Sequence, residues 1–387
     1  MADISTCSAL TRSSVVEAHD IVKPHVHRTP VLTNRTLTEL ASTPRTESDL
    51  KGTRWEGRTP ARPVLRLWFK CENMQRIGAF KVRGAFHAVE KLKKEPGWLE
   101  GGGKEKGVVT HSSALALAAS ESGIKAHIVM PDISPALKVN ATRGYGANVI
   151  FSGSTSVERE AVADRVIAET GARLVPPYDH PDIMLGQGTL GLELQQQVAD
   201  MMAAESGSAG GISGLERAPT TRSSKGDGGL DAIIAPCGGG GMLSGVALSC
   251  EGTGIRVYGA EPSFQGADDA KRGYESGSRI EAVSTLTVAD GLRTPVGVHP
   301  WGVIYERRLV SGFYSVTEDE IKAAMRLVLE RFKLVVEPSG CVPLAVALFD
   351  EDFRAMVEKE AGPEGWDLGL VFSGGNVGAE TVGKLFA

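Results

Sequence analysis

Residues 70–84 read Lys-Cys-Glu-Asn-Met-Gln-Arg-Ile-Gly-Ala-Phe-Lys-Val-Arg-Gly and follow a largely apolar run, 64–69, that predicts a strand. Lys81 lies here among small and apolar residues. Because partial burial disfavours the ammonium form, this setting favours a neutral amine. A neutral amine can form an imine with an aldehyde, which makes Lys81 a candidate for covalent catalysis. An ordinary surface lysine at the start of a helix is the alternative that this segment alone leaves open.

A run of four glycines, 238–241, separates a short apolar run, 231–235, from helix-forming residues. Glycine backbones let several N–H groups converge on one anion, and a helix N-terminus adds partial positive charge. The run lacks the Gly-Lys-Ser/Thr ending of nucleoside triphosphate loops, and the Gly-x-Gly-x-x-Gly spacing is not cleanly met. Considered together with the lysine, the glycines favour a phosphate-binding loop; considered alone, they also fit a flexible turn.

A third candidate segment lies near the C-terminus, where a predicted buried strand, 367–372, runs into Ser-Gly-Gly-Asn at 373–376. The carboxyl ends of parallel strands face the crevice in which α/β proteins bind ligands. The Ser373 hydroxyl is therefore well placed to meet a ring nitrogen of a ligand. In isolation, these four residues are more often only a turn.

The rest of the chain alternates short apolar runs with amphipathic segments. Runs at 107–110, 126–130 and 148–151 predict strands, with a helix at 114–122 between the first two. Residues 317–320, Thr-Glu-Asp-Glu, predict a capping box that opens another helix. This alternation predicts an α/β fold with parallel sheets flanked by helices.

In this order, the lysine segment, the glycine run and the Ser-Gly-Gly-Asn segment resemble the two-domain, fold-type II pyridoxal phosphate (PLP) enzymes, which have a tryptophan synthase β-like fold. The resemblance is specifically to the serine racemase and threonine dehydratase (ammonia-lyase) group. Further segments match that group along nearly the whole chain: 27–32, 143–149, 186–189, 261–263, 289–291 and 337–339. These ordered matches are specific to the family, but they do not fix the substrate.

The resemblance implies a division into two domains. A large PLP-binding domain would comprise residues 1–103 and 180–387, and a small domain, 104–179, would be inserted between them. Two further segments, about 41–63 and 205–229, are polar or rich in Gly, Ser, Thr and Pro. We interpret both as surface insertions and expect them to be mobile loops.

The resemblance also implies roles for single residues. Lys81 would bind PLP covalently and then act as acid or base on one face of the substrate Cα. Ser373 would hydrogen-bond the pyridine nitrogen; a neutral hydroxyl does not stabilise a pyridinium as a carboxylate does, which suits loss of a β-hydroxyl group. Glu337 would flank the ring, the alternative being a helix-end or turn carboxylate. The remaining implied cofactor contacts are Phe80 beside the ring and the phosphate-binding residues Gly238, Gly239, Gly240, Gly241 and Met242.

Racemisation requires a second acid or base opposite Lys81, and the resemblance points to Ser113. The family carries this serine in Ser-Ser-Gly-Asn-His-Gly/Ala-Gln-Ala, whereas residues 109–117 read Val-Thr-His-Ser-Ser-Ala-Leu-Ala-Leu. The five family residues after the second serine are therefore absent. That loop normally contacts the cofactor and the substrate carboxylate, so its loss could cost on the order of a hundredfold in rate. We expect an impaired site or one rebuilt differently, with Ser112 or His111 as the available substitutes.

A divalent-cation site is also implied by the resemblance. Glu261, the Ala267 backbone carbonyl and Asp269 match a racemase-group site for Mg²⁺ or Ca²⁺, and oxygen ligands suit such hard cations. Residues 264–266, Phe-Gln-Gly, replace a shorter link, so the register is open by a residue or two. A solvated acidic turn is the alternative.

Composition limits the partners and the compartment. The net charge is −5 without a long basic block, so we expect no nucleic acid or anionic membrane as partner. No apolar stretch approaches the length of a membrane span, and the N-terminal residues lack a secretory pattern. An odd number of cysteines without metal-ligand spacing indicates reduced thiols and a cytoplasmic location. They are Cys7, Cys71, Cys237, Cys250 and Cys341.

We predict a PLP enzyme that converts L-serine or L-threonine to a 2-oxo acid and ammonia by α,β-elimination, with serine racemisation as a second activity. The chain ends eleven residues after Asn376, so we expect no C-terminal regulatory module like that of biosynthetic threonine dehydratases. A homodimer is implied by the resemblance. The alternatives are a threo-3-hydroxyaspartate ammonia-lyase, or a catalytically impaired family member that acts as a binding or dimerising subunit because of the gap after Ser113.

Overall fold

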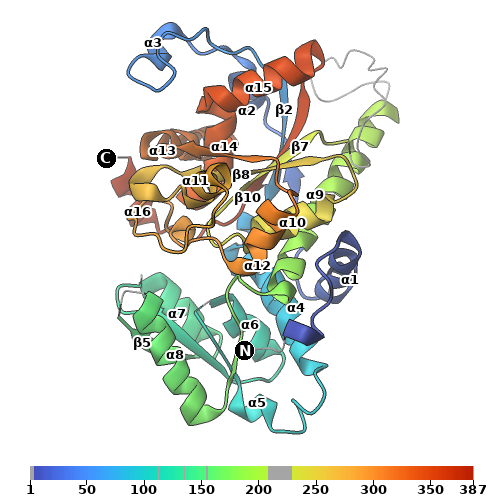
Figure 1. Ribbon diagram of the computed structural model, residues 1–387, viewed down its shortest axis with the longest axis vertical. Helices are drawn as coiled ribbons and strands as arrows, with labels where there is room; N and C mark the ends of the chain where they lie inside the picture. The colour runs from blue at the N-terminus through green and yellow to red at the C-terminus, as the bar shows by residue number, and fades with distance from the viewer. Residues whose placement is uncertain (1–3, 112, 135, 154–155, 208–228, 387) are drawn as a thin grey trace.

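The computed structural model describes residues 4–111, 113–134, 136–153, 156–207 and 229–386, and its strands form two separate sheets (Figure 1). The larger sheet has the strand order β1-β2-β10-β7-β8-β9, and the smaller has the order β5-β4-β3-β6. Neighbouring strands are parallel throughout the described residues, except for the antiparallel pair β1 and β2. The predicted α/β fold with parallel sheets is therefore confirmed.

The six-stranded sheet draws its strands from both halves of the chain. Its strands are β1 (Val31–Leu32), β2 (Leu65–Cys71), β7 (Ala232–Pro236), β8 (Arg256–Pro262), β9 (Gly312–Val316) and β10 (Trp366–Phe372). Strands β7 and β10 are buried along their whole length, as expected when helices cover both faces of a parallel sheet. Successive side chains enter opposite cores: Ile233 packs in one apolar cluster and Ile234 in the other.

The four-stranded sheet is built from one continuous part of the chain. Its strands are β3 (Val108–Thr110), β4 (Ala126–Pro131), β5 (Asn148–Ser152) and β6 (Arg173–Leu174), and its helices are α6 (Ser113–Glu121), α7 (Ala136–Gly144) and α8 (Ser156–Thr170). In Figure 1 these elements, drawn in teal and green, lie together apart from the larger sheet. All of them fall between the expected domain boundaries at 104 and 179, which themselves stay a prediction.

Helices cover both faces of the larger sheet. Helices α2 (Arg35–Ser42), α13 (Glu318–Leu327) and α14 (Pro338–Phe349) bury apolar residues in one core, while α1 (Arg12–Val22), α9 (Pro181–Gly207) and α10 (Gly241–Cys250) bury theirs in the other. The predicted capping box opens α13, since the Thr317 side chain accepts from Glu320 N and the Glu320 side chain accepts from Thr317 N. The other helices are α3 (Glu47–Leu50), α4 (Lys81–Lys93), α5 (Gly103–Lys106), α11 (Asp269–Ser276), α12 (Val298–Trp301), α15 (Glu351–Ala361) and α16 (Ala379–Leu385).

Glycines bring helix α9 into close contact with both α4 and α10. A Cβ atom on Gly186 of α9 would lie 2.7 Å from the Gly84 Cα of α4, and one on Gly188 would lie 2.5 Å from the Gly245 carbonyl oxygen of α10. Side chains at these crossings would force the helices apart. Helix α9 thus fixes the two helices that begin at the candidate lysine and at the glycine run.

One of the two expected mobile loops is instead packed against the protein. Within 41–63, Leu50, Trp55 and Ala61 are buried, and Arg54 Nη2 donates to Asp350 Oδ2 at 2.7 Å. The expectation of a mobile loop was wrong there, because the polar composition concealed three apolar anchors. Most of the other segment, 205–229, lies outside the described residues. Among the described residues, we find no helix with the length and apolarity that a membrane crossing requires.

Candidate active site

Lys81 is the first residue of α4, and the two residues before it are hydrogen-bonded to the Ser-Gly-Gly-Asn segment. Phe80 N donates to the Ser373 carbonyl oxygen at 3.0 Å, and Ala79 forms an isolated antiparallel bridge with Gly374. Burial among protein atoms, followed by the nearby charge of Lys138, lowers the pKa of the Lys81 amine, although its side chain remains exposed to solvent. The amine is therefore accessible to a ligand and biased toward its neutral form.

The backbone just before Lys81 is held in an unfavourable conformation. Ile77 has φ 61°, a value that β-branched residues rarely adopt. Two hydrogen bonds hold this turn to the segment after β10: Asn376 Nδ2 donates to the Ile77 carbonyl oxygen at 2.9 Å, and Gly375 N donates to Gly78 O at 2.9 Å. The turn that presents the lysine is thus fixed by residues some 300 positions away in the sequence.

Glu337 joins the same group of segments. Its backbone N donates to Gly374 O at 3.0 Å, and its carboxylate oxygen Oε2 accepts from Asn376 N at 3.1 Å. Burial and the charge of Asp290 raise the pKa of Glu337, and the nearby charge of Lys81 opposes that shift. Glu337 is therefore close enough to the lysine to interact with it electrostatically, beyond its position as the residue that precedes helix α14.

The glycine run needs glycine because other atoms approach it closely. A Cβ on Gly239 would lie 2.4 Å from the Tyr178 ring, and one on Gly238 would lie 2.9 Å from the Gly291 carbonyl oxygen. Gly240 has φ 83°, which favours glycine. Within the described part of the chain, the backbone amides between Cys237 and Ser244 have no hydrogen-bond acceptor, and they surround the start of α10. This is the arrangement that binds a phosphate. Tyr178 was not singled out from the sequence.

The glycine run and the lysine segment meet through residues 290–292 and helix α14. Gly291, which touches Gly238, donates its N–H to Ser339 Oγ at 3.0 Å, and Ser339 lies two residues after Glu337. Met242 is buried in the same core cluster against which Phe80 packs. The structure therefore brings the three predicted segments together. These three segments and the two that connect them are called the large-sheet segments: residues 77–81, 237–242, 290–292, 337–339 and 373–376.

These residues fit the cofactor that the sequence resemblance implies. A neutral-biased amine suits an aldehyde, and unpaired amides at a helix N-terminus suit a phosphate. Ser373 is buried at the end of β10, where a hydroxyl rather than a carboxylate would face the ring nitrogen. The chemistry of the donor set matches PLP at each of these three positions.

The sequence predicts that the other side of the site comes from the turn between β3 and α6, next to the four-stranded sheet. Only His111 and Ser112 connect β3 to α6, so Ser113 starts the helix directly. Ser112 lies outside the described residues. Ser113 is half-buried, and the buried His111 Nδ1 has no hydrogen-bond partner among the described residues. The short connection is the structural form of the gap seen in the sequence.

Lys138 was missed in the sequence analysis and reaches the site from helix α7. Its Nζ donates to Asp290 Oδ2 at 2.8 Å, and this hydrogen bond joins helix α7 to the large-sheet segments. Burial alone would lower the pKa of Lys138, but Asp290 and Glu337 outweigh it and raise the pKa. Lys138 is therefore a positive charge beside the candidate lysine. Residues 111–113 and Lys138 are called the small-sheet residues below.

The predicted metal ligands occupy one buried corner of the larger sheet. Glu261 is the last but one residue of β8, Asp269 starts α11, and both are almost fully buried. Residues 264–266 form a single tight turn in which Gln265 has φ 51°, and Ala267 follows this turn two residues before Asp269. Burial, then mutual repulsion, raises the pKa of Glu261 well above its usual range. Two adjacent buried carboxylates are a donor set that a hard cation would stabilise.

A buried ion network lies behind Lys81. Arg83 is fully buried, and its guanidinium donates to the carboxylates of Glu72 and Glu193 at 2.7 to 2.9 Å. The ammonium of Lys70, also fully buried, donates to Glu193 at 2.7 Å. Two cations and two anions thus compensate each other beneath the first turn of α4.

Comparisons with known proteins agree with this site. The family model described as "Pyridoxal-phosphate dependent enzyme" matches residues 53–225 and 224–361. A serine racemase from Arabidopsis thaliana is 38% identical over 371 residues, covering 94% of this chain and 92% of that protein. The L-threo-3-hydroxyaspartate ammonia-lyase of Saccharomyces cerevisiae is 34% identical over 375 residues, covering 95% and 93%. The solved structure of maize serine racemase has a TM-score of 0.76 at 35% identity, covering 98% of this chain and 97% of that one.

The fold and the large-sheet segments define an α/β enzyme whose cofactor is an aldehyde with a phosphate group. The chain belongs to the family of pyridoxal-phosphate dependent enzymes.

Proposed function

We propose that the protein catalyses α,β-elimination of L-serine or L-threonine to a 2-oxo acid and ammonia, with racemisation at the serine Cα as a second reaction. The observation that carries this proposal is the position of Lys81: a neutral-biased, accessible amine that follows a turn hydrogen-bonded to Ser373 and lies close enough to Glu337 to be influenced by its charge. The racemases and ammonia-lyases at 34 to 38% identity support the reaction class.

Each large-sheet residue has a definite task in this reaction. The amides of residues 238–242 hold the cofactor phosphate, and Ser373 hydrogen-bonds the ring nitrogen without adding charge. When bound, PLP withdraws electrons from the substrate Cα and so makes its proton labile. Lys81 holds the cofactor and then takes that proton from one face of Cα. Glu337 flanks the ring.

The small-sheet residues act on the substrate. Ser113 moves the proton on the opposite face of Cα, which racemisation requires and elimination does not. Lys138 replaces the missing loop as the partner of the substrate carboxylate, because it is a cation beside Lys81 that can exchange Asp290 for the substrate. A carboxylate held there places Cα near the lysine.

Three further features belong to the proposal. Glu261, the Ala267 carbonyl and Asp269 bind Mg²⁺ or Ca²⁺, which compensates the two buried carboxylates. The protein acts as a homodimer in the cytoplasm on a small amino acid, without nucleic-acid or membrane partners. The large and small domains divide at residues 104 and 179.

A second candidate substrate is L-threo-3-hydroxyaspartate. The yeast ammonia-lyase supports it, because that relative matches 95% of this chain. A second substrate carboxylate would need a cation besides Lys138, which already pairs with the first carboxylate in this proposal. The third candidate, a catalytically impaired member of the family, is supported by the two-residue connection between β3 and α6.

One set of assays separates these candidates. The purified protein is incubated with L-serine, L-threonine or L-threo-3-hydroxyaspartate, and 2-oxo acid, ammonia and D-serine are measured. We expect yellow protein whose cofactor is fixed on Lys81 by borohydride, and 2-oxo acid from serine or threonine. Yellow protein without product from any substrate would support the impaired form, and colourless protein would contradict the proposal.

The gap after Ser113 can be tested in the same assays. Inserting the family residues Gly-Asn-His-Gly-Gln after Ser113 restores the loop, and we expect the elimination rate to rise by on the order of a hundredfold. The matched control inserts five glycine and serine residues at the same place. If neither insertion raises the rate, the gap after Ser113 does not limit the reaction, and the expected impairment is wrong.

A further inference from the structure

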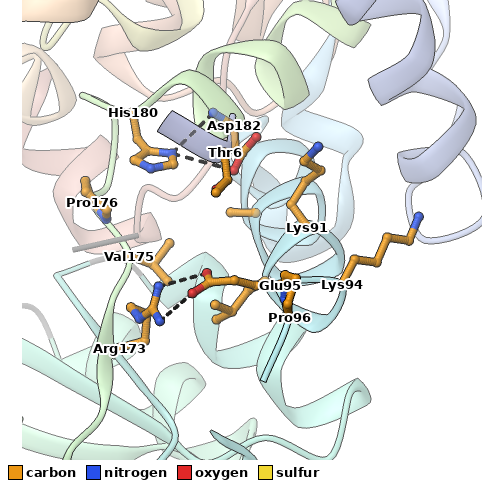
Figure 2. A pocket seen from close by; sticks show the side chains of 12 residues that line it. Thr6, Lys91, Lys94, Glu95, Pro96, Arg173, Val175, Pro176, His180 and Asp182 are labelled. Carbon is orange, nitrogen blue, oxygen red and sulfur yellow. Dashed lines mark hydrogen bonds and ion pairs between the residues drawn. The ribbon is translucent and has the colours of Figure 1, made fainter. Parts of the chain in front are cut away.

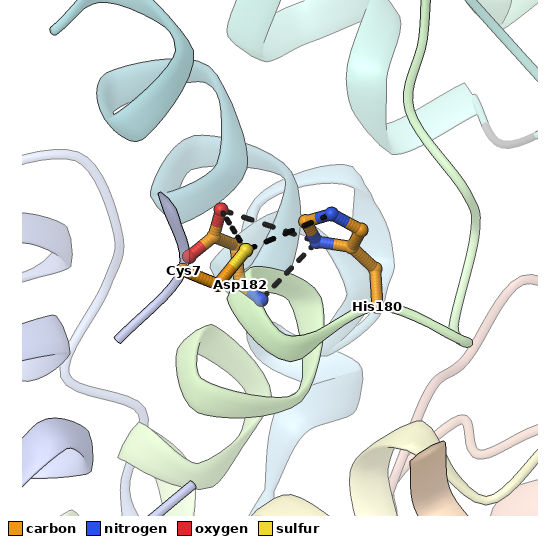
Figure 3. A group of neighbouring side chains, drawn as sticks. All are labelled: Cys7, His180 and Asp182. Carbon is orange, nitrogen blue, oxygen red and sulfur yellow. Dashed lines mark hydrogen bonds and ion pairs between the residues drawn. The ribbon is translucent and has the colours of Figure 1, made fainter. Parts of the chain in front are cut away.

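Three side chains with metal-binding atoms converge away from the candidate active site (Figure 3). Cys7 lies in the N-terminal segment, His180 directly precedes α9, and Asp182 lies in its first turn. Cys7 Sγ is 3.6 Å from Asp182 Oδ2 and 3.9 Å from His180 Nε2, and His180 Nδ1 is 3.9 Å from Asp182 Oδ2. The three side chains point toward a common centre.

The separations are close to those of ligands around one ion. Around tetrahedral Zn²⁺, with its usual bond lengths, sulfur, nitrogen and oxygen ligands lie about 3.3 to 3.6 Å apart. The Sγ–Oδ2 separation matches these values, whereas the two 3.9 Å separations involve different ring nitrogens of His180. With one nitrogen chosen, the three ligand atoms all lie within 4.8 Å of one another. Rotation of the His180 ring and of the Cys7 side chain would close the group on an ion.

One carboxylate oxygen of this group lacks a partner. Asp182 is 6% exposed and His180 is 3% exposed, so both are more than nine-tenths buried. Asp182 Oδ1 makes no hydrogen bond within the described part of the chain. A buried acceptor of this kind is costly when it is left unsatisfied, and a bound cation would satisfy it.

A cavity adjoins the group and leaves one side of it open. The cavity has a volume of about 190 Å³, and Thr6, His180 and Asp182 are among its lining residues (Figure 2). Catalytic and regulatory zinc sites use three protein ligands and keep a fourth position for water or another small ligand. The cavity supplies space for that fourth ligand.

We propose that Cys7, His180 and Asp182 bind a Zn²⁺-class transition-metal ion, with its fourth position open to the cavity. A thiolate, an imidazole and a carboxylate select such an ion over Mg²⁺ or Ca²⁺. The ion would join the N-terminal segment to the chain that returns from the four-stranded sheet into α9. This site is separate from the Glu261 and Asp269 site and does not depend on the proposed reaction.

The protons balance in a simple way. The Cys7 S–H bond breaks, a sulfur–metal bond forms, and the proton leaves to solvent. His180 Nδ1 accepts from Asp182 N at 3.2 Å, so this nitrogen already carries the lone pair that the ion needs. The displaced amide lies in the first turn of α9, where backbone N–H groups have no partner within the helix.

The test is zinc binding to the holoenzyme in saturating Mg²⁺, measured by competition with a chromophoric chelator. We expect one tight Zn²⁺ per chain, and at least about tenfold weaker binding in Cys7→Ser and in Asp182→Asn. Lys94→Gln is the matched control, since Lys94 lines the cavity without belonging to the ligand set. Equal affinity in the wild type and both ligand variants would overturn the proposal, as would zinc lost only in Glu261→Gln.

A second measurement needs no variant and so does not depend on how the variants fold. Cys7 is the only cysteine that is not fully buried among the described residues, so iodoacetamide should label it first. We expect Zn²⁺ to slow alkylation of the Cys7 peptide at least about tenfold by mass spectrometry, and Mg²⁺ to leave it unchanged. Alkylation that Zn²⁺ does not slow would contradict the proposed site.

Discussion

Three of the large-sheet segments, 77–81, 337–339 and 373–376, are joined to one another by backbone hydrogen bonds, whereas Lys138 reaches Asp290 from the four-stranded sheet through one long side chain. These segments would hold a cofactor whose shape and charge never change. Lys138 would hold substrates, which differ between related enzymes. Rigid backbone positions would therefore serve the constant partner, and a side chain that can rearrange would serve the varying substrates.

Removing Lys81 should abolish the catalytic function of the large-sheet segments. We expect Lys81→Ala to lower kcat for 2-oxo acid formation by more than about a thousandfold, because Asp290 and Glu337 raise the pKa of the neighbouring Lys138 amine and so keep it from accepting the Cα proton. Borohydride should no longer fix the cofactor to the peptide that contains residue 81. Lys322→Ala, on an exposed helix surface, is the control and should keep full activity. Covalent labelling of another lysine in the Lys81 variant would refute the assignment.

Removing the Lys138 charge should impair the small-sheet side and spare the cofactor. We expect Lys138→Met to raise KM by about tenfold to a hundredfold, which is the loss of a charge-assisted contact of about 1.5 to 3 kcal/mol. Because Lys138 helps to lower the pKa of Lys81, the variant apoenzyme should capture PLP only at higher pH. Lys384→Met, on exposed helix α16, is the control. An unchanged KM with an unchanged capture profile would remove Lys138 from the site.

Glycine-to-alanine substitutions should distinguish a glycine that other atoms approach closely from one with open space around it. At Gly239 a Cβ would meet the Tyr178 ring, so we expect Gly239→Ala to lower the free energy of unfolding by about 1 to 3 kcal/mol and to weaken PLP binding. A Cβ at Gly383 would have no atom within 4 Å, so Gly383→Ala should be neutral or slightly stabilising. Urea denaturation measures both. If the clash is the cause, adding Tyr178→Ala should restore part of the loss.

The smallest expected effect is that of a cation at Glu261 and Asp269 on the thermal stability of the protein, and this effect should depend on pH. The pKa values of Glu261 and Asp269 are raised in the folded protein, so without metal the stability falls as pH rises above the ordinary carboxyl range near 4. Mg²⁺ or Ca²⁺ should therefore raise Tm by a few degrees at pH 7 and by less at pH 5. Glu261→Gln should abolish the difference. An equal shift in that variant would show that the ion binds elsewhere.

Local sequence signals were enough to find the large-sheet segments. The strands β2, β7 and β10 appear as apolar runs, and the lysine segment, the glycine run and Ser373 follow them in that order. In parallel sheets the carboxyl ends of strands share one edge, so finding the strands also placed Lys81, the glycine run and Ser373 near each other. The resemblance then supplied roles that no local pattern contains, such as that of Glu337.

Long-range partners could not be found in this way. Lys138 and Asp290 are 152 positions apart, and Cys7 and Asp182 are 175 apart. No periodicity or spacing relates such residues, because tertiary packing alone brings them together. The prediction for segment 41–63 failed for a related reason. Its mostly polar composition indicated a loop, whereas Leu50, Trp55 and Ala61, which are scattered along it, are buried in the protein.

The ion network behind Lys81 restricts how this enzyme can evolve. Replacing Glu72, Arg83 or Glu193 alone would strand a charge in an environment without water, at a cost of about 3 to 5 kcal/mol, a large fraction of the stability of an ordinary domain. Such single steps would be lost from a population before a compensating change arose. Libraries that vary these positions one at a time should therefore find them invariant, while libraries that vary them jointly should recover apolar replacements.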